Sequence, residues 1–224
     1  MQLDEAIQGR RSVRHFLAEP VPRADIEIML EAACWAPSST NFQPWRFMVI
    51  LQRDLIEQMA RLVYDRFDEA LQEVRRRRQE REARAAGALL RFLRGYGSFF
   101  DNAPAVIVAC GVPYAVPKFG PLGDAAIAKI AEAGGDQVAH TFFSTVDKSV
   151  AMATQNLLLK AHEMGYGAVA IDTPLAVGGQ IKTLLGMLDK DPTRVIILIA
   201  LGRPAEVPLP PPRRPVADIA RFYE

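Results

Sequence analysis

The chain has 224 residues, half of them hydrophobic, and a formal net charge of +1. This hydrophobic content excludes an intrinsically disordered protein, and the length fits one domain that can fold without a disulfide or a metal. The nearly neutral charge gives no general attraction to nucleic acid or anionic lipid, and no apolar run reaches the ~18 residues that a membrane span requires.

The N-terminus and the cysteines indicate the compartment. The first residues have no basic stretch followed by a long apolar run, so no secretory signal is expected. Cys34 and Cys110 form no CxxC pair, and we expect both to be small buried residues in a reducing compartment. We therefore expect a cytoplasmic protein.

The first half of the chain alternates between helix and strand patterns. Residues 22–34 have helical periodicity, and residues 46–51 form an apolar run typical of a buried strand. The loop at 35–44 between them is rich in Ser, Pro, Thr and Asn. Residues 53–94 are helical and highly charged, and residues 106–109 are a second candidate for a buried strand.

The second half begins with several Gly and Pro residues at 113–143, which we expect to be irregular apart from a short helix near 124–133. Residues 145–164 have the pattern of a long buried helix that ends at Gly165. The remaining expected elements are a strand at 167–171, a helix near 179–188, a strand at 194–201 and an extended proline-rich tail at 207–215. Helices that alternate with strands indicate a sheet covered by helices.

A basic motif, Arg10-Arg11-Ser12-Val13-Arg14, lies near the N-terminus. If this segment is extended, Arg10, Ser12 and Arg14 point to one side and offer several donors to a single anion. The motif alone is compatible with a phosphate site and also with a solvated basic N-terminus.

Three further polar segments are candidates for ligand contacts. The loop at 36–45 could hydrogen-bond a polar heterocycle, or it could be a plain turn that Trp45 anchors in the core. Asp172, Thr173 and Pro174 directly follow an expected strand, where loops often bind ligands. Arg213 follows a proline run and could belong to a site or to an exposed basic tail.

In combination, these motifs resemble the nitroreductase-like FMN oxidoreductases, in particular the branch that includes iodotyrosine deiodinases. The resemblance rests on an RRSVR segment, a PSSTNxQPW loop, a TPL turn and a basic residue near the end, in that order. It covers residues 10–50 and about 150–220. It implies an α+β fold with a mixed sheet wrapped by helices, and an intertwined homodimer with FMN at two interface sites.

The resemblance also implies roles for individual residues. Arg10, Arg11, Ser12, Val13 and Arg14 would hold the phosphate and ribityl end of FMN, with Arg213 at the phosphate. The partner chain would contribute loop residues near the isoalloxazine ring, namely Pro37, Ser38, Ser39, Asn41 and Gln43. Asp172, Thr173 and Pro174 would face flavin N5, where either the Thr173 hydroxyl or a backbone N–H could donate.

The expected activity is electron transfer from NAD(P)H through FMN to a small acceptor such as a nitroaromatic, a quinone or an enone. The chain lacks a Rossmann glycine fingerprint, so NAD(P)H would dock over the flavin. Reductive dehalogenation, oxygen-dependent flavin chemistry and flavin binding without turnover remain alternatives. No metal-ligand spacing is evident, and no nucleic-acid or membrane partner is expected.

We expect residues 1–224 to form a single domain in which a variable helical segment at about 64–143 covers the substrate side. Its arginines are expected to lie on a solvated helix face, with ion pairs such as Glu73–Arg77 and Arg78–Glu82. An alternative is that arginines or aromatic residues of this segment select an anionic or aromatic substrate. The acidic, tyrosine and lysine clamp of the deiodinases is not evident, which argues against a halotyrosine substrate.

Overall fold

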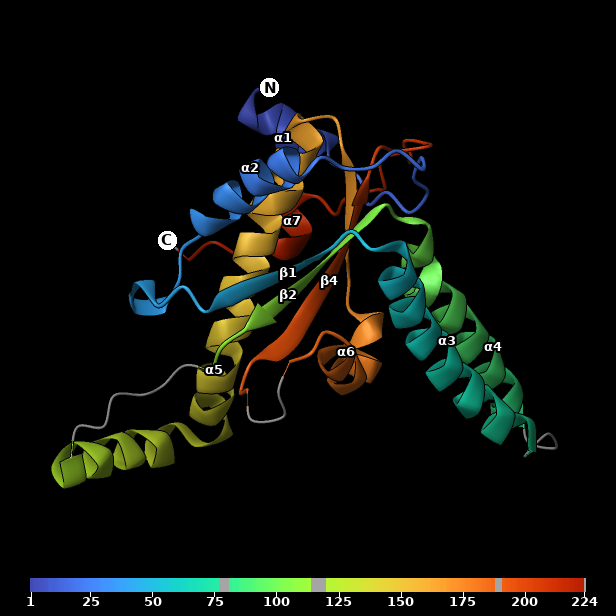
Figure 1. The fold of residues 1–224 in the computed structure, drawn as a ribbon. Coiled ribbons are helices and arrows are strands. Elements are labelled where there is room, and N and C mark those ends of the chain that lie inside the picture. Colours follow the sequence, from blue (N-terminus) through green and yellow to red (C-terminus); the bar gives the residue numbers. More distant parts are fainter. Residues whose placement is uncertain (77–80, 114–119, 188–190, 224) are drawn as a thin grey trace.

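The computed structural model describes residues 1–76, 81–113, 120–187 and 191–223. In these residues a sheet of four strands has helices on both faces (Figure 1). The elements in chain order are α1 (Leu3–Gly9), α2 (Arg23–Cys34), η1 (Ser39–Asn41), β1 (Trp45–Ile50), α3 (Arg53–Arg76), α4 (Arg81–Ser98), η2 (Phe99–Asn102), β2 (Ala105–Gly111), α5 (Gly120–Glu163), β3 (Gly167–Ile171), η3 (Thr173–Val177), α6 (Gly178–Leu184), β4 (Arg194–Gly202) and α7 (Val216–Ile219). None of the helices in these ranges is both long and apolar enough to cross a membrane.

The sheet has the strand order β1-β2-β4-β3, and each neighbouring pair is antiparallel. The expected α+β class is confirmed, and so are the four strands that the apolar runs predicted. Among the described strands, the parallel component of the expected mixed sheet is limited to an isolated bridge between Ser12 and Ala168 of β3. This bridge matters for function because it places the basic N-terminal segment at the edge of the sheet.

The core lies on both faces of the sheet. Every residue of β2 is buried, and successive side chains of this strand enter different clusters. Ile107 packs with residues of α2 and α5, whereas Val108 packs with residues of α3 and α6. A strand that is buried on both faces carries a continuous apolar run, which is why its pattern was clear in the sequence.

Helix α5 corrects the prediction for residues 113–143. The helix already begins at Gly120 and continues to Glu163, although Pro121 and several glycines suggested an irregular segment. Proline is tolerated in a first helical turn, and a glycine costs only about 1 kcal/mol in a helix, so neither forbids this extension. The end of α5 agrees with the prediction, because Gly165 has φ +77° and Tyr166 N–H donates to Ala161 O at 2.8 Å.

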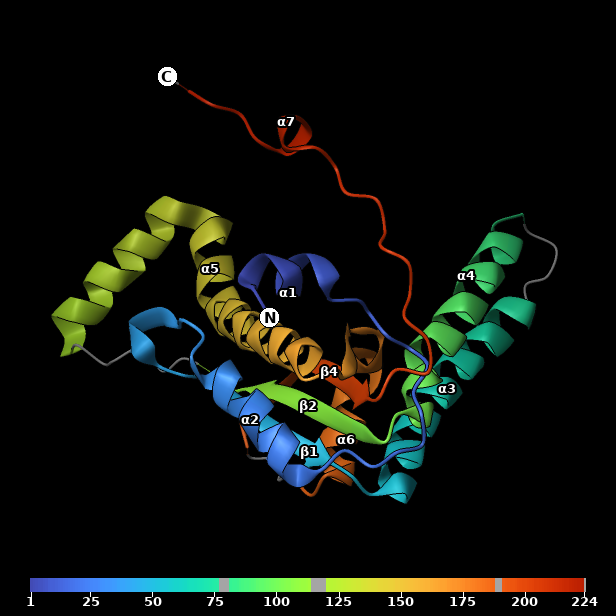
Figure 2. The same ribbon diagram turned by 90° about the horizontal axis from the view of Figure 1, so that it is seen from above.

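The charged region at 53–94 is a hairpin of α3 and α4 (Figure 2). The predicted pairs of Glu73 with Arg77 and of Arg78 with Glu82 depend on side chains outside the described residues. Among the described side chains, Glu73 contacts Arg76 at 3.3 Å, and Arg66 contacts Glu69 at 3.4 Å on the exposed surface. Within the range 64–143 the core strand β2 separates this hairpin from α5, so the expected helical segment is not one continuous insertion.

The C-terminal segment after β4 extends away from the body of the chain before reaching α7 (Figure 2). Its apolar side chains Val207, Leu209, Phe222 and Tyr223 are all exposed. Cys34, at the end of α2, is exposed as well, whereas Cys110 is buried in β2. The expectation of two buried cysteines is therefore wrong for Cys34, because helical periodicity places it off the face of α2 that packs on α5.

Candidate functional site

The segment at residues 10–14 lies along the edge of the sheet at β3. Arg10 is the last residue associated with α1 and already has extended dihedral angles, φ −57° and ψ 134°. Val13 is buried, and its N–H donates to Ala168 O at 3.3 Å. The buried Val13 and its backbone contact fix the position from which the neighbouring polar side chains project.

Arg10 lies in a strongly positive environment. Burial lowers the pKa of its guanidinium, and the charges of Arg213 and Arg11 lower it further. The charge of Arg213 in the C-terminal tail therefore acts on Arg10 within the same chain. The Nε atom of Arg10 is buried, and no hydrogen-bond partner for it lies among the described residues.

Arg11 makes different contacts. Its Nη1 donates to the carbonyl oxygens of Gln8 at 2.6 Å, Gly9 at 3.0 Å and Arg10 at 3.0 Å. These carbonyls lie at the C-terminal end of α1, where a cation is favourable. Arg11 therefore stabilises the helix end and contributes its charge to the site from there.

Arg14 connects the N-terminal segment to α4. Its Nη1 donates to Ser12 O at 3.2 Å, and its Nη2 donates to the Tyr96 hydroxyl at 2.6 Å. The guanidinium also lies over the Tyr96 ring, 4.9 Å from the centroid. Its Nε is buried, again without a partner in the described part of the chain.

The positive charges of these arginines are not neutralised within the described structure. Across the described ranges, no carboxylate forms an ion pair with Arg10, Arg11, Arg14 or Arg213. Grouped guanidinium groups with unused donors are suited to a phosphate dianion, which needs cations when it leaves water. The donor set therefore fits the phosphate end of FMN.

The turn after β3 lies against the same helix. Thr173 begins η3, and a Cβ added to Gly97 of α4 would meet Thr173 Cγ2 at 2.5 Å. Glycine at position 97 is therefore required for this close approach. Arg14 contacts Tyr96 and Thr173 contacts Gly97, so two consecutive residues of α4 bring the predicted phosphate and N5 residues together. Next to Thr173, Asp172 is exposed and Pro174 is buried.

The loop between α2 and β1 is held in an unusual conformation. Thr40, Asn41 and Gln43 have positive φ values of 52°, 54° and 49°. The Gln43 N–H donates to Ser38 Oγ at 3.0 Å, and Gln43 Nε2 donates to Asn41 Oδ1 at 3.1 Å. Positive φ at residues other than glycine often marks ligand sites, because the surrounding structure must stabilise it. The remaining predicted loop residues, Pro37 and Ser39, are exposed.

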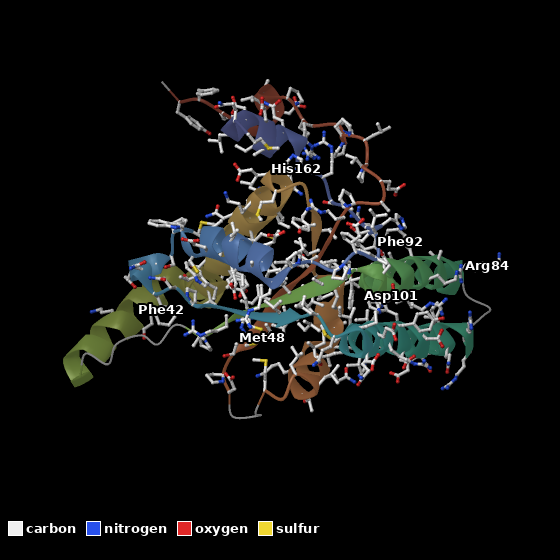
Figure 3. The ribbon with its side chains drawn as sticks, turned by 45° about the horizontal axis from the view of Figure 1, so that its top comes forward. Phe42, Met48, Arg84, Phe92, Asp101 and His162 are labelled. Atoms are coloured by element: carbon white, nitrogen blue, oxygen red, sulfur yellow. The ribbon has the colours of Figure 1, made fainter. Side chains whose placement is uncertain are left out.

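This loop is far from the other predicted site residues within one chain. Phe42 of the loop and Phe92 of α4 lie at opposite ends of the molecule (Figure 3). Both ribbon views also place the loop and the α3–α4 hairpin on opposite sides of the sheet (Figures 1 and 2). The structure therefore divides the predicted residues into two groups, residues 10–14 with 172–174 and 213, and residues 37–43.

The structure adds His162 and Tyr96 to the predicted site residues. His162 lines a cavity of about 170 Å³ together with Arg10, Arg11 and Val13. Burial lowers the pKa of His162, and the charges of Arg10 and Arg11 lower it further. Neither residue was recognisable from the sequence, because each approaches the arginines only through tertiary packing. In the sequence, the four-residue spacing of Phe92 and Tyr96 indicated only that both aromatic side chains lie on one side of a helix.

Comparison with known proteins places these observations in a family context. The sequence model described as "Nitroreductase family" matches residues 7–203. A Methanothermobacter thermautotrophicus protein named for NADH dehydrogenase/NAD(P)H nitroreductase is 29% identical over 213 residues, which cover 93% of this chain and 80% of that protein. Rat iodotyrosine deiodinase 1 is 23% identical over 201 residues, and the match covers 90% of this chain but only 61% of the deiodinase.

Two solved structures resemble the chain over its full length. A BluB-like flavoprotein from Clostridium difficile 630 has a TM-score of 0.84 and 27% identity, with 100% of both chains covered. An oxidized iodotyrosine deiodinase bound to FMN and 3-iodo-L-tyrosine has a TM-score of 0.69 and 22% identity, also with 100% of both chains covered. The second similarity supports the fold alone.

Proposed function

This chain belongs to the nitroreductase family, and from that membership we propose that it binds FMN and acts as an FMN-dependent oxidoreductase. The observation that carries the proposal is the pair of buried Nε atoms of Arg10 and Arg14, which have no partner among the described residues. A buried donor without a partner costs about 1–3 kcal/mol, so an anionic ligand at this position would stabilise the segment. The similar flavoprotein and the FMN-bound structure of the same fold support this choice of ligand.

The proposed roles follow from the contacts. Arg10, Arg14 and Arg213 bind the phosphate and ribityl end, Ser12 and Val13 contribute the backbone of the edge segment, and Arg11 supplies charge while it holds α1. The turn formed by Asp172, Thr173 and Pro174 faces the N5 side of the ring. Bound FMN would supply the redox chemistry, with electrons passing from NAD(P)H to a nitroaromatic, quinone or enone.

We further propose that residues 1–224 form a single FMN-binding domain that is active as a homodimer. Within one chain, Phe42 of the loop lies far from Phe92 of α4, so in the proposed site this loop comes from a second copy (Figure 3). The ordered polar groups of the loop, Ser38, Ser39, Asn41 and Gln43, would then contact the isoalloxazine ring of the partner's FMN, as would Pro37. The exposed apolar tail supports the same arrangement, since it has little contact with its own chain.

The absorption spectrum of the purified protein tests the cofactor assignment. We expect absorption bands at about 370 and 450 nm, typical of oxidised flavins, and FMN as the species released on heat denaturation. Arg14→Ala should lower the FMN content without unfolding the chain, whereas Arg61→Ala, on the exposed side of α3, should retain it. A colourless wild-type protein that also fails to take up added FMN would refute the proposed function.

Kinetic measurements separate the alternative activities. Because donor and acceptor are proposed to use one cavity in turn, steady-state lines should be parallel at several fixed acceptor concentrations. Bound flavin that NAD(P)H does not reduce under anaerobic conditions would indicate a binding protein without this turnover. A redox titration that reveals stable one-electron reduction would favour radical chemistry such as reductive dehalogenation. The similarity to iodotyrosine deiodinase 1 is the reason to consider this alternative.

A further inference from the structure

Tyr96 packs against two aromatic neighbours, one in α4 and one in η2. Its ring stacks on Phe92 with centroids 5.3 Å apart and an interplanar angle of 20°. Phe99 of η2 approaches the same ring at 6.1 Å with a tilt of 59°. The next residue, Gly97, packs so closely against the Thr173 side chain that a Cβ at position 97 would clash with it. The hydroxyl of Tyr96 therefore projects from a well-defined position beside the proposed site.

Arg14 depends on this hydroxyl for its own orientation. A guanidinium has five N–H donors in a fixed plane, so two separate anchors determine where the others point. One anchor is Ser12 O, two residues away in the same segment, and the other is Tyr96 Oη, 82 residues away in sequence. The Tyr96 and Phe99 rings add cation–π contacts at 4.9 and 5.9 Å. The buried Nε and the unused Nη hydrogens are thereby left for a ligand.

We propose that Tyr96 is a positioning residue for Arg14, which holds the guanidinium so that its remaining donors meet the phosphate and ribityl end of the cofactor. The proposal rests on the proposed FMN function and deepens it. It also couples the α3–α4 hairpin to the cofactor, because the hairpin supplies the second anchor of an arginine that binds FMN. Such coupling is reciprocal, so bound FMN stabilises the end of α4 in return.

The hydroxyl can be removed without loss of the ring in Tyr96→Phe. Tyr64→Phe is a matched control, since Tyr64 lies under Arg94 at 4.5 Å in the same hairpin but does not contact Arg14. Deflavinated protein is titrated with FMN, and binding is followed by quenching of flavin fluorescence. Because the Arg14 guanidinium then keeps only one of its two hydrogen-bond anchors, we expect Tyr96→Phe to raise the Kd for FMN about tenfold. Tyr64→Phe should leave the Kd unchanged.

A double-mutant cycle separates positioning from direct contact with FMN or from a general structural effect. If Tyr96 acts through Arg14, Tyr96→Phe should have no further effect on FMN affinity in an Arg14→Met background. The far-UV circular dichroism of the FMN-free Tyr96→Phe protein should match that of the wild type, because only one side-chain hydrogen bond is removed.

The outcomes are distinguishable. Wild-type affinity in Tyr96→Phe, or additive losses in the double variant, would overturn the positioning role while leaving the FMN function intact. A wild-type protein that does not bind FMN would overturn both.

Discussion

Among single residues, His162 gives a direct test of the phosphate site. Its pKa lies below the ordinary value of 6.5 because of burial and because Arg10 and Arg11 repel a positive imidazolium. A phosphate dianion bound to these arginines would offset that repulsion and favour the protonated form. We therefore expect the pKa of His162 to rise when FMN binds, as measured by NMR titration.

Riboflavin is the matched ligand for this titration, since it carries the same ring and ribityl chain but no phosphate. It should leave the pKa of His162 nearly where it is in the free protein. An unchanged pKa in protein saturated with FMN would place the phosphate away from Arg10 and Arg11. The assignment is practical because the chain has only three histidines.

A partly buried ion pair joins α3 to α4. Arg94 Nη1 lies 2.5 Å from Asp68 Oδ1, with both side chains mostly shielded from water, and Arg94 also covers the Tyr64 ring. Because removing one partner leaves the other charge uncompensated, Arg94→Met should lower the free energy of unfolding by about 2 kcal/mol. Urea denaturation of the FMN-free protein measures this loss.

The exposed pair between Arg61 and Asp65, at 3.8 Å in the same helix α3, is the control for this prediction. Solvent screens such pairs, so Asp65→Asn should change the unfolding free energy by less than about 0.5 kcal/mol. Equal effects of the two substitutions would mean that the Arg94–Asp68 contact has no special part in joining the helices.

The assembly of two chains should depend on the C-terminal tail. Deletion of residues 207–224 removes exposed apolar side chains that include Val207, Leu209 and Phe222, and it also removes Arg213. We expect the truncated protein to be monomeric by analytical ultracentrifugation and to lose FMN. Arg213→Ala in the full-length chain should remain dimeric and bind FMN more weakly, which separates the loss of the phosphate contact from the loss of the partner. Retention of FMN by a monomer would contradict the shared site.

Local sequence patterns were sufficient to predict most helices and strands and to single out the basic segment at residues 10–14. The apolar runs predicted the strands because β2 and β4 are largely buried, and Gly165 marked the end of α5 because a left-handed residue is needed there. Local patterns failed for the N-terminal part of α5, where glycines and a proline weaken the helical signal without preventing a helix. They also failed for Cys34, whose exposure depends on which face of α2 meets α5.

The sequence by itself determined the α+β class, the order of the elements and the presence of a group of arginines near the N-terminus, because each of these depends on residues close together in the chain. Only the tertiary structure decided which partner each of these arginines has. Arg11 holds the end of α1, the charge of Arg213 in the tail acts on Arg10, and Arg14 donates to the Tyr96 hydroxyl of α4. Such interactions join residues that lie far apart in the sequence, 82 positions for Arg14 and Tyr96, and depend on chain packing that no local periodicity encodes.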